Sequence, residues 1–218
     1  MVPRGLEPSG ILLVDKPAGP TSFDVVAAVR RRTGARTGHA GTLDPFATGL
    51  LLLLSGAATK LQGRFAGLEK RYRTAIDLSA RTATGDPEGE VIEAREPPSG
   101  EELERLLASL RGEIELRVPA ASAVKIGGER AYRLHRAGVA VEMPLRRSTV
   151  HELELRSYED GVARLELLVS AGTYVRAIAD ALGGHCVELR RTAIGPFAVE
   201  EADDERLIPV EVALARLR

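Results

Sequence analysis

The residues best suited to chemistry lie in one loop, Gly38-His-Ala-Gly-Thr-Leu-Asp-Pro45. Gly38 and Gly41 permit backbone conformations and close approaches that a side chain would block. Pro45 disfavours the helical conformation at Asp44, and so holds its carboxylate on an extended segment. A carboxylate is ionised at neutral pH without activation, so Asp44 could act as a nucleophile or base. The alternative is that Asp44 is an ordinary turn residue.

Other kinds of catalytic site find little support in the sequence. The four histidines are scattered, and the single cysteine, Cys186, has no CxxC partner, which disfavours a metal site. The chain contains no GxGxxG, Walker or GxSxG motif. These observations disfavour hydride transfer, nucleotide hydrolysis and serine-type acyl transfer. We interpret Cys186 as a core residue.

The segments on either side of this loop have the patterns of regular elements. Residues 10–15 form a short apolar run that predicts a strand. Thr21 offers a cap for a helix that runs to Arg32, and Gly34 ends that helix. Residues 50–54 are all leucine and predict a buried strand directly after the loop. The loop is therefore expected between two buried elements.

Strands and helices alternate irregularly along the rest of the chain. Ser99 is suited to cap an acidic helix, and Asp160-Gly161 is typical of a hairpin turn. Further helices are predicted at residues 57–68, 101–110, 173–182 and 207–217, and further strands at 72–78, 149–156, 162–169 and up to Val199. This order lacks a βαβ rhythm, so we predict an α+β fold with a largely antiparallel sheet.

Residues 117–147 differ from the rest because they combine proline, small residues and scattered arginines. A short helical patch is expected near residues 131–136. We interpret the segment as a long protruding arm, and arms of this length are usually functional. The candidate phosphate contacts on it are arginines, with solvated surface charges as the alternative: Arg130, Arg133, Arg136, Arg146 and Arg147.

Composition indicates a protein of ordinary globular type with an uneven charge. The chain has 218 residues, 44% of them hydrophobic, and its net charge is −1. Residues 1–80 carry a net charge of +5 and residues 81–115 a net charge of −6, and arginine outnumbers lysine 26 to 4. A basic half can bind a polyanion, although a coding bias towards arginine is the alternative. No apolar run is long enough to span a membrane, and the first ten residues lack the order of a signal peptide, so we expect a cytoplasmic protein.

One extended motif resembles a known family. The segment Gly38-His-Ala-Gly-Thr-Leu-Asp-Pro-Phe-Ala-Thr-Gly49 is similar to the catalytic motif of the TruB family of tRNA pseudouridine synthases. Other blocks resemble segments of the same family, in the same order: Leu13-Val-Asp-Lys-Pro-Ala-Gly-Pro-Thr-Ser22, Ala57-Ala-Thr-Lys60, Lys70-Arg-Tyr-Arg73, Thr82-Ala-Thr-Gly-Asp-Pro-Glu-Gly89, Ser122-Ala-Val-Lys125, Arg130-Ala-Tyr132, Gly172-Thr-Tyr-Val-Arg176 and Leu189-Arg-Arg-Thr192.

The resemblance implies a reaction and a fold. Members of the family convert the uridine at position 55 in the T-loop of tRNA to pseudouridine. They break the bond between ribose and base nitrogen, turn the base and rejoin it through carbon, without a metal or organic cofactor. The implied fold is a mixed, largely antiparallel pseudouridine-synthase sheet with flanking helices and an RNA-binding arm at about residues 117–147. We expect residues 1–218 to form one catalytic domain without the family's usual small C-terminal RNA-binding domain, and to act as a monomer.

The same resemblance assigns three residues to the reaction. Asp44 matches the catalytic aspartate, which acts as nucleophile or base on the target nucleotide. Arg176 matches an arginine that pairs with this aspartate and keeps it charged and oriented. Tyr72 matches an aromatic residue that stacks on the flipped base, which offsets part of the cost of taking that base out of its stack.

Four further residues match positions near the substrate. His39 resembles a histidine that fills the space vacated in the RNA, and Lys16 matches a lysine that supports the site. Tyr174 and Leu189 match residues that line the uracil pocket. Ordinary core or surface roles remain the alternatives for each.

Two other functions compete with this one. An aspartyl-phosphate phosphotransferase places its aspartate before a Gly-Thr-Leu sequence, whereas Asp44 follows Gly41-Thr-Leu43, and no cluster of magnesium-binding carboxylates is evident. A non-catalytic RNA-binding or RNA-folding module could retain the arm and the basic half, and in that case Asp44 would be dispensable.

Overall fold

The leucine run of residues 50–54 lies in strand β3 (Thr48–Ser55), which is buried from Gly49 onward. The computed structural model describes residues 9–217, which divide into two units. Unit 1 takes the described residues up to Arg73 and from Leu189 onward, and unit 2 is Thr74–Glu188. The sequence predicts that the first ten residues are not a signal peptide. Eight of these ten, residues 1–8, lie outside the described part of the chain.

In unit 1, β3 is flanked by antiparallel partners and by one parallel partner, β12 (His185–Ile194). β1 (Gly10–Lys16) pairs with β3 in a register that places Leu13 opposite Leu52. The strand order in this unit is β14 (Asp203–Ile208), β1, β3 and β12, with β2 (Thr37–His39) on β3 and β13 (Phe197–Ala198) on β12.

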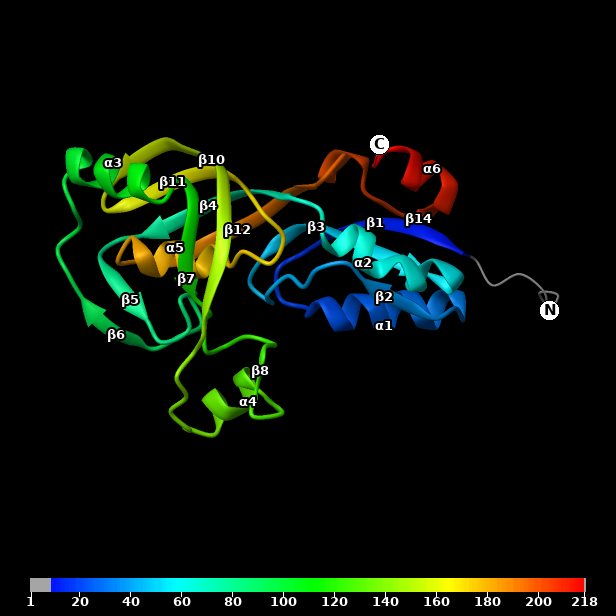
Figure 1. Cartoon of the computed structure of the whole chain (residues 1–218), viewed down its shortest axis with the longest axis horizontal. Helices are drawn as coiled ribbons and strands as arrows, with labels where there is room; N and C mark the ends of the chain where they lie inside the picture. Colours follow the sequence, from blue (N-terminus) through cyan, green and yellow to red (C-terminus); the bar gives the residue numbers. More distant parts are fainter. Residues whose placement is uncertain (1–8, 218) are drawn as a thin grey trace. The chain divides into compact units, whose positions relative to one another are not determined.

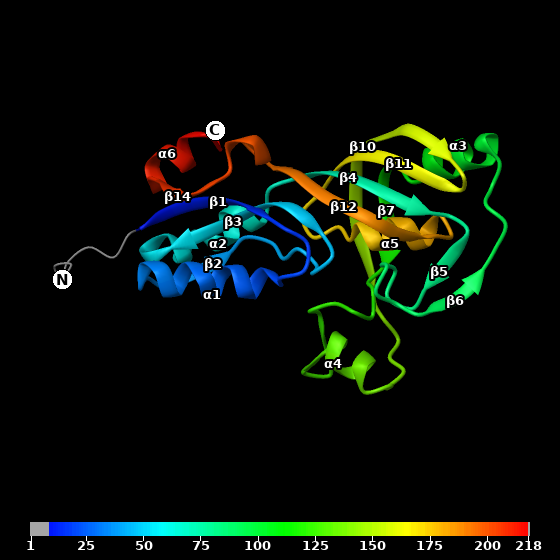
Figure 2. The same cartoon turned by 180° about the vertical axis from the view of Figure 1, so that it is seen from behind.

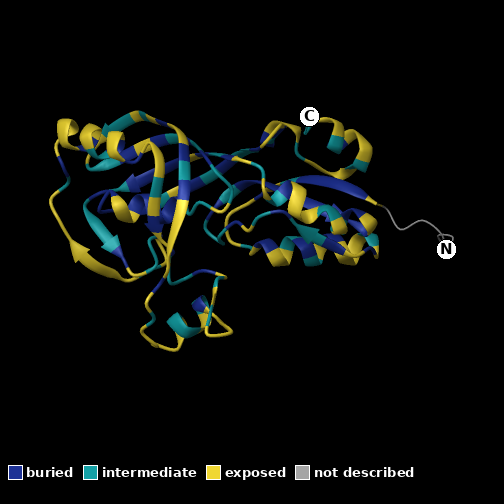
Figure 3. Ribbon diagram, in the orientation of Figure 1, coloured by how far each residue is buried: buried dark blue, intermediate teal, exposed yellow. Residues whose placement is uncertain are grey.

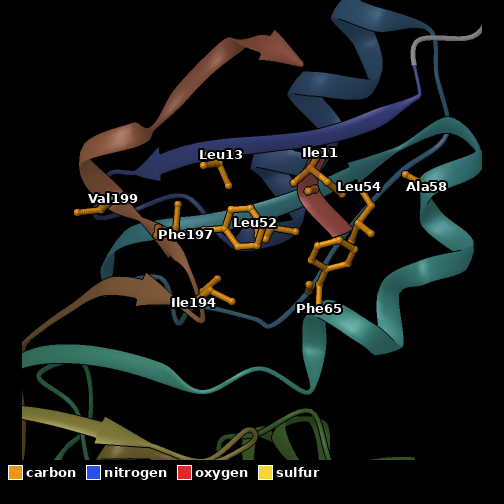
Figure 4. Packing of buried hydrophobic residues seen from close by; sticks show 12 residues of the cluster. Ile11, Leu13, Leu52, Leu54, Ala58, Phe65, Ile194, Phe197 and Val199 are labelled. Atoms are coloured by element: carbon orange, nitrogen blue, oxygen red, sulfur yellow. The ribbon is translucent and has the colours of Figure 1, made fainter. Parts of the chain in front are cut away.

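The alternation of side chains along β3 supplies two separate cores. Leu51 and Leu53 pack against Val26 and Val29 of helix α1 (Ser22–Thr33). The neighbouring leucines point to the opposite face, where they join a cluster with two packed rings, Phe65 and Phe197 (Figure 4). Helix α6 (Val210–Ala215) covers this second face, while α1 covers the first (Figure 1, Figure 2). A strand covered on both faces is apolar at every position, as residues 50–54 are.

Unit 2 carries the remaining strands of the sheet. Their order is β12, β4, β11, β10 and β7. The bounds are Lys70–Asp77 for β4, Val162–Val169 for β11, Leu145–Glu159 for β10 and Gly112–Arg117 for β7. The unit also contains helices α3 (Gly100–Ser109) and α5 (Val175–Ala181) and a hairpin of β5 (Ala80–Thr82) and β6 (Val91–Ala94). Strands β4 and β12 each begin in one unit and continue into the other.

The arm, residues 117–147, connects β7 to β10 and is folded. It contains β8 (Lys125–Ile126), β9 (Glu129–Arg130) and α4 (Ala131–Arg136), which confirms the expected helical patch. Its small apolar cluster contains Val118, Ala131 and Met143, while most of its other residues are exposed (Figure 3).

The α+β fold with a largely antiparallel sheet is confirmed, as are several local predictions. Thr21 caps α1 in a capping box, and Gly34 ends it with a φ of 69°. Asp160 and Gly161 both have positive φ, 50° and 77°, as the tight turn between β10 and β11 requires. Cys186 is buried. Among the described residues, no helix is long and apolar enough to cross a membrane.

Two predicted elements were wrong in detail. The helix expected at residues 57–68 is a 3₁₀ turn, η1 (Gly56–Leu61), followed by the short α2 (Gln62–Ala66). The Thr59 hydroxyl donates to the Gly56 carbonyl and competes with regular helical bonding, and Gly63 weakens the continuation. Val199 does not end the last strand, because β14 follows it; this strand begins with four exposed polar residues and so carries no apolar pattern.

Candidate active site

Asp44 lies in the loop between β2 and β3 and is half-buried. Gly41 has a φ of 124°, a conformation that side chains other than glycine rarely adopt. The Asp44 carbonyl accepts a hydrogen bond of 3.1 Å from the backbone amide of Ala47, so the chain turns immediately after the carboxylate. This turn leads directly into β3.

Lys16 is fully buried beneath this loop. Its Nζ donates to three backbone carbonyls, those of Pro17 at 2.8 Å, Pro20 at 2.8 Å and Pro45 at 3.1 Å. Burial lowers the pKa of Lys16, and the negative charge of Asp44 opposes this shift. The structure therefore brings Lys16 and Asp44 together, with the ammonium holding the residue that follows the carboxylate.

Arg191 on β12 fixes the other end of the loop, and it was not singled out in the sequence. Its side chain is 1% exposed. Nε donates to the Leu50 carbonyl at 2.7 Å, while Nη2 and Nη1 donate to the carbonyls of Gly41 at 3.0 Å and Thr42 at 3.4 Å. A planar guanidinium has five N–H donors in a fixed fork, so it can hold acceptors that lie in different directions. No local pattern in the sequence reveals these contacts, because the partners are about 150 positions away.

Tyr72 and Leu189 belong to unit 1 and are both largely buried. Tyr72 lies on β4 beside Arg71, whose carbonyl accepts from the Thr192 hydroxyl at 3.3 Å. Lys70, two residues before Tyr72, has its pKa lowered to about 8 by burial and by the neighbouring charge of Arg191. No pattern in the sequence predicts a buried lysine at this position.

His39 ends β2, and its ring is partly buried. Among the described residues, Nδ1 has no hydrogen-bond partner. Burial lowers the pKa of His39, and the charge of Arg191 lowers it further. Both effects favour the neutral form of the ring, whose Nδ1 is buried.

Arg176 lies on α5 in unit 2 and is 2% exposed. Its guanidinium donates to the carbonyls of Thr84 at 2.6 Å and Ala121 at 2.9 Å, and lies 3.3 Å from the Asp86 carboxylate. Asp86 also accepts from the Thr84 hydroxyl at 2.6 Å and from the Glu88 amide at 3.1 Å. This buried ion pair gives the guanidinium a fixed orientation within unit 2. Asp44 belongs to unit 1 and Arg176 to unit 2, so the pairing expected between them stays a prediction.

Tyr174 immediately precedes α5 and packs against the apolar cluster of the arm. The two neighbouring arginines of α4, Arg133 and Arg136, lie over the ring of Tyr132 at 6.0 and 5.8 Å from its centroid. Arg147 pairs with Glu115 at 3.3 Å but remains 90% exposed. With seven lysines and arginines against two glutamates, the arm has a net charge of +5.

The described residues contain no group of three or more His, Cys, Asp or Glu side chains that could hold a metal ion. Unit 1 instead holds a carboxylate on a fixed loop. The same unit also contains buried cations, an aromatic ring and an imidazole for which the neutral form is favoured. A carboxylate held in this way is suited to act as a nucleophile or base.

Two solved structures share this architecture. A chain described as belonging to a Cbf5-Nop10-Gar1 complex is 28% identical, with a TM-score of 0.67 over 93% of this chain and 52% of the other. The present chain thus spans about half the length of that one. A chain described as a pseudouridylate synthase shares the fold, with a TM-score of 0.52 and 19% identity over 98% of this chain and 75% of the other.

Sequence comparison then identifies the family. A profile of the TruB family pseudouridylate synthase (N terminal domain) matches residues 30–175. A curated relative from Mycobacterium sp. (strain KMS), named tRNA pseudouridine synthase B, is 44% identical over 207 residues, which cover 88% of this chain and 69% of the relative. The chain belongs to the TruB family of pseudouridylate synthases.

Proposed function

We propose that this chain converts the uridine at position 55 in the T-loop of tRNA to pseudouridine, with Asp44 as the reacting carboxylate. The observation that carries the proposal is the anchored loop around Asp44, tied at one end by Arg191 and at the other by Lys16. Such anchoring is useful for a group that must meet a reacting atom within a fraction of an ångström.

The reaction is an isomerisation and needs no co-reactant. The bond between ribose C1′ and N1 of uracil breaks, the base turns, and a new bond forms between C1′ and C5. The hydrogen on C5 leaves as a proton, and N1 takes up one proton. Asp44 acts as nucleophile or base on the target nucleotide, and Arg176 pairs with its carboxylate.

Further side chains hold the flipped base in this proposal. Tyr72 stacks on the uracil, and Tyr174 and Leu189 line its pocket. His39 fills the space that the base vacates, and Lys16 supports the loop from below. Stacking on an aromatic ring offsets part of the few kcal/mol that base flipping costs.

The arm is proposed to grip the RNA backbone. Its net charge of +5 supports this role, because phosphate contacts respond to local rather than overall charge. The candidate contacts are Arg130, Arg133, Arg136, Arg146 and Arg147. In this proposal residues 1–218 act as one catalytic domain, as a monomer and in the cytoplasm, on tRNA as substrate.

The proposal is tested with unmodified tRNA that carries tritium at C5 of its uracils. Tritium is released only if the base is rejoined to the sugar through C5. We expect release by the wild-type chain and none by Asp44→Asn, with the two binding tRNA equally well. Binding without release by the wild type would favour the alternative of a non-catalytic RNA-binding module.

A further inference from the structure

Ser22 makes an unusual contact with the residue that precedes Asp44. Its side chain is 2% exposed, at the first position of α1. The hydroxyl donates to the Leu43 carbonyl at 2.9 Å and accepts from the Leu43 amide at 2.8 Å. A hydroxyl can do both at once because it has one donor and two acceptor sites. Both backbone polar groups of Leu43 are therefore bound to a single atom.

The Ser22 hydroxyl is not needed to begin the helix. Thr21 caps α1, because its hydroxyl accepts from the Asp24 amide at 3.1 Å and its own amide donates to the Asp24 carboxylate at 2.9 Å. The contacts of Ser22 are directed at the loop instead, 21 positions further along the chain.

The backbone on the other side of Asp44 is held from the same segment. The Pro45 carbonyl accepts from the Gly19 amide at 2.9 Å and from Lys16 Nζ at 3.1 Å. Residues on both sides of Asp44 are thus tied to the chain between Lys16 and Ser22. Of these three contacts, the Ser22 contact alone fixes an amide and a carbonyl together, so it sets the orientation of the chain that enters Asp44.

We propose that Ser22 is a positioning residue for the isomerisation. The inference rests on the proposed function, in which Asp44 is the reacting carboxylate. Removal of the hydroxyl frees the backbone of Leu43 and lets the Asp44 carboxylate move relative to the substrate. A displacement of about 1 Å can cost on the order of a hundredfold in rate.

The test compares three variants of the full chain in single-turnover tritium release, tRNA binding and thermal unfolding. Ser22→Ala removes the bridging hydroxyl. Ser55→Ala is the matched control, since Ser55 is buried in the same unit and its hydroxyl has no hydrogen-bond partner among the described residues. Val26→Ala removes buried methyl groups from α1 without touching the loop, and controls for loss of stability.

We expect Ser22→Ala to lower the single-turnover rate by about tenfold or more, with the tRNA dissociation constant within about twofold of wild type. Val26→Ala should unfold at a lower temperature and keep its rate. If Ser22→Ala fails to fold, Ser22→Cys decides, because a thiol fills the site but bonds weakly. A wild-type rate in Ser22→Ala, or in Ser22→Cys if Ser22→Ala does not fold, would overturn the inference alone, whereas no release by the wild type would overturn the proposed function itself.

Discussion

Arg191 of β12 lies directly opposite Gly49 of β3, because the two residues are partners in the parallel pairing of these strands. A Cβ atom on Gly49 would lie 2.2 Å from the Arg191 carbonyl oxygen, and the φ of Gly49 is 101°. The close approach of these two backbones lets the buried guanidinium reach back to Gly41 and Thr42. Gly49, which ends the motif around Asp44, and Arg191, which holds the loop in place, therefore depend on one another.

Gly49→Ala should destabilise the protein by about 2–5 kcal/mol, because the new methyl group meets backbone atoms and the φ is strained. Gly34→Ala is the control. Gly34 also has a positive φ, 69°, but nothing lies within 4 Å of the added Cβ atom, so about 1 kcal/mol is expected. Urea unfolding measures the free energy of unfolding of both variants. Equal losses of this free energy would mean that the strands can separate to admit the methyl group.

Arg191→Met should lower the free energy of unfolding by about 3 kcal/mol or more, since three backbone carbonyls lose the buried guanidinium as a donor. The neighbouring Arg190 provides the comparison. It pairs with Asp15 at 2.7 Å at an exposed position, so Arg190→Met should cost less than about 1 kcal/mol. Chemical denaturation measures the free energy of unfolding of both variants. Similar losses in Arg191→Met and Arg190→Met would show that the buried contacts of Arg191 contribute little to stability.

Lys70 should make stability depend on pH in the alkaline range. Its pKa is about 8 in the folded chain against an ordinary 10.5, so between these values the unfolded chain binds more protons. Stability should therefore rise with pH across this window, by up to roughly 3 kcal/mol. The difference between wild type and Lys70→Met in unfolding free energy at pH 8 and pH 10 isolates this contribution. A constant difference would contradict the lowered pKa.

Tyr72→Leu should reduce turnover strongly, by at least about tenfold, because the leucine cannot stack on a flipped base as a ring does. Tyr72→Phe keeps the ring and removes only the hydroxyl, so the two variants separate the contribution of the ring from that of the hydroxyl. Single-turnover tritium release and melting temperature are measured together. Normal turnover in Tyr72→Leu would make Tyr72 a core residue only.

The arm should make tRNA binding sensitive to salt. If Arg136 contacts a phosphate, Arg136→Gln should reduce the slope of log K against log salt by roughly 0.7–0.9. Arg164→Gln is the control. Arg164 lies on the sheet rather than on the arm, and it forms an ion pair with Glu188 at 3.0 Å. Slopes are measured by tRNA titration, and identical slopes for wild type and Arg136→Gln would remove that residue from the phosphate contacts.

Local signals explain what could be predicted from the sequence. The Thr21 cap, the Gly34 end and the Asp160-Gly161 turn each depend on neighbouring residues, and all three formed as expected. The contacts of Ser22 and Arg191 join residues that are 21 and about 150 positions apart, and no periodicity encodes them. β14 was missed because its exposed polar residues look like a loop until β1 supplies a partner.

The division of the chain also sets an order of events during translation. Unit 2 is one continuous segment, whereas unit 1 is interrupted by it between Arg73 and Leu189. Domains generally fold as their segments leave the ribosome. β1 and β3 are synthesised early but must wait for β12 and β14, and Arg191 cannot reach Gly41 until all of unit 2 has been synthesised. The loop that carries Asp44 is therefore fixed only after unit 2 has been synthesised, so a nascent chain stalled before Leu189 holds its aspartate without the contacts of Arg191.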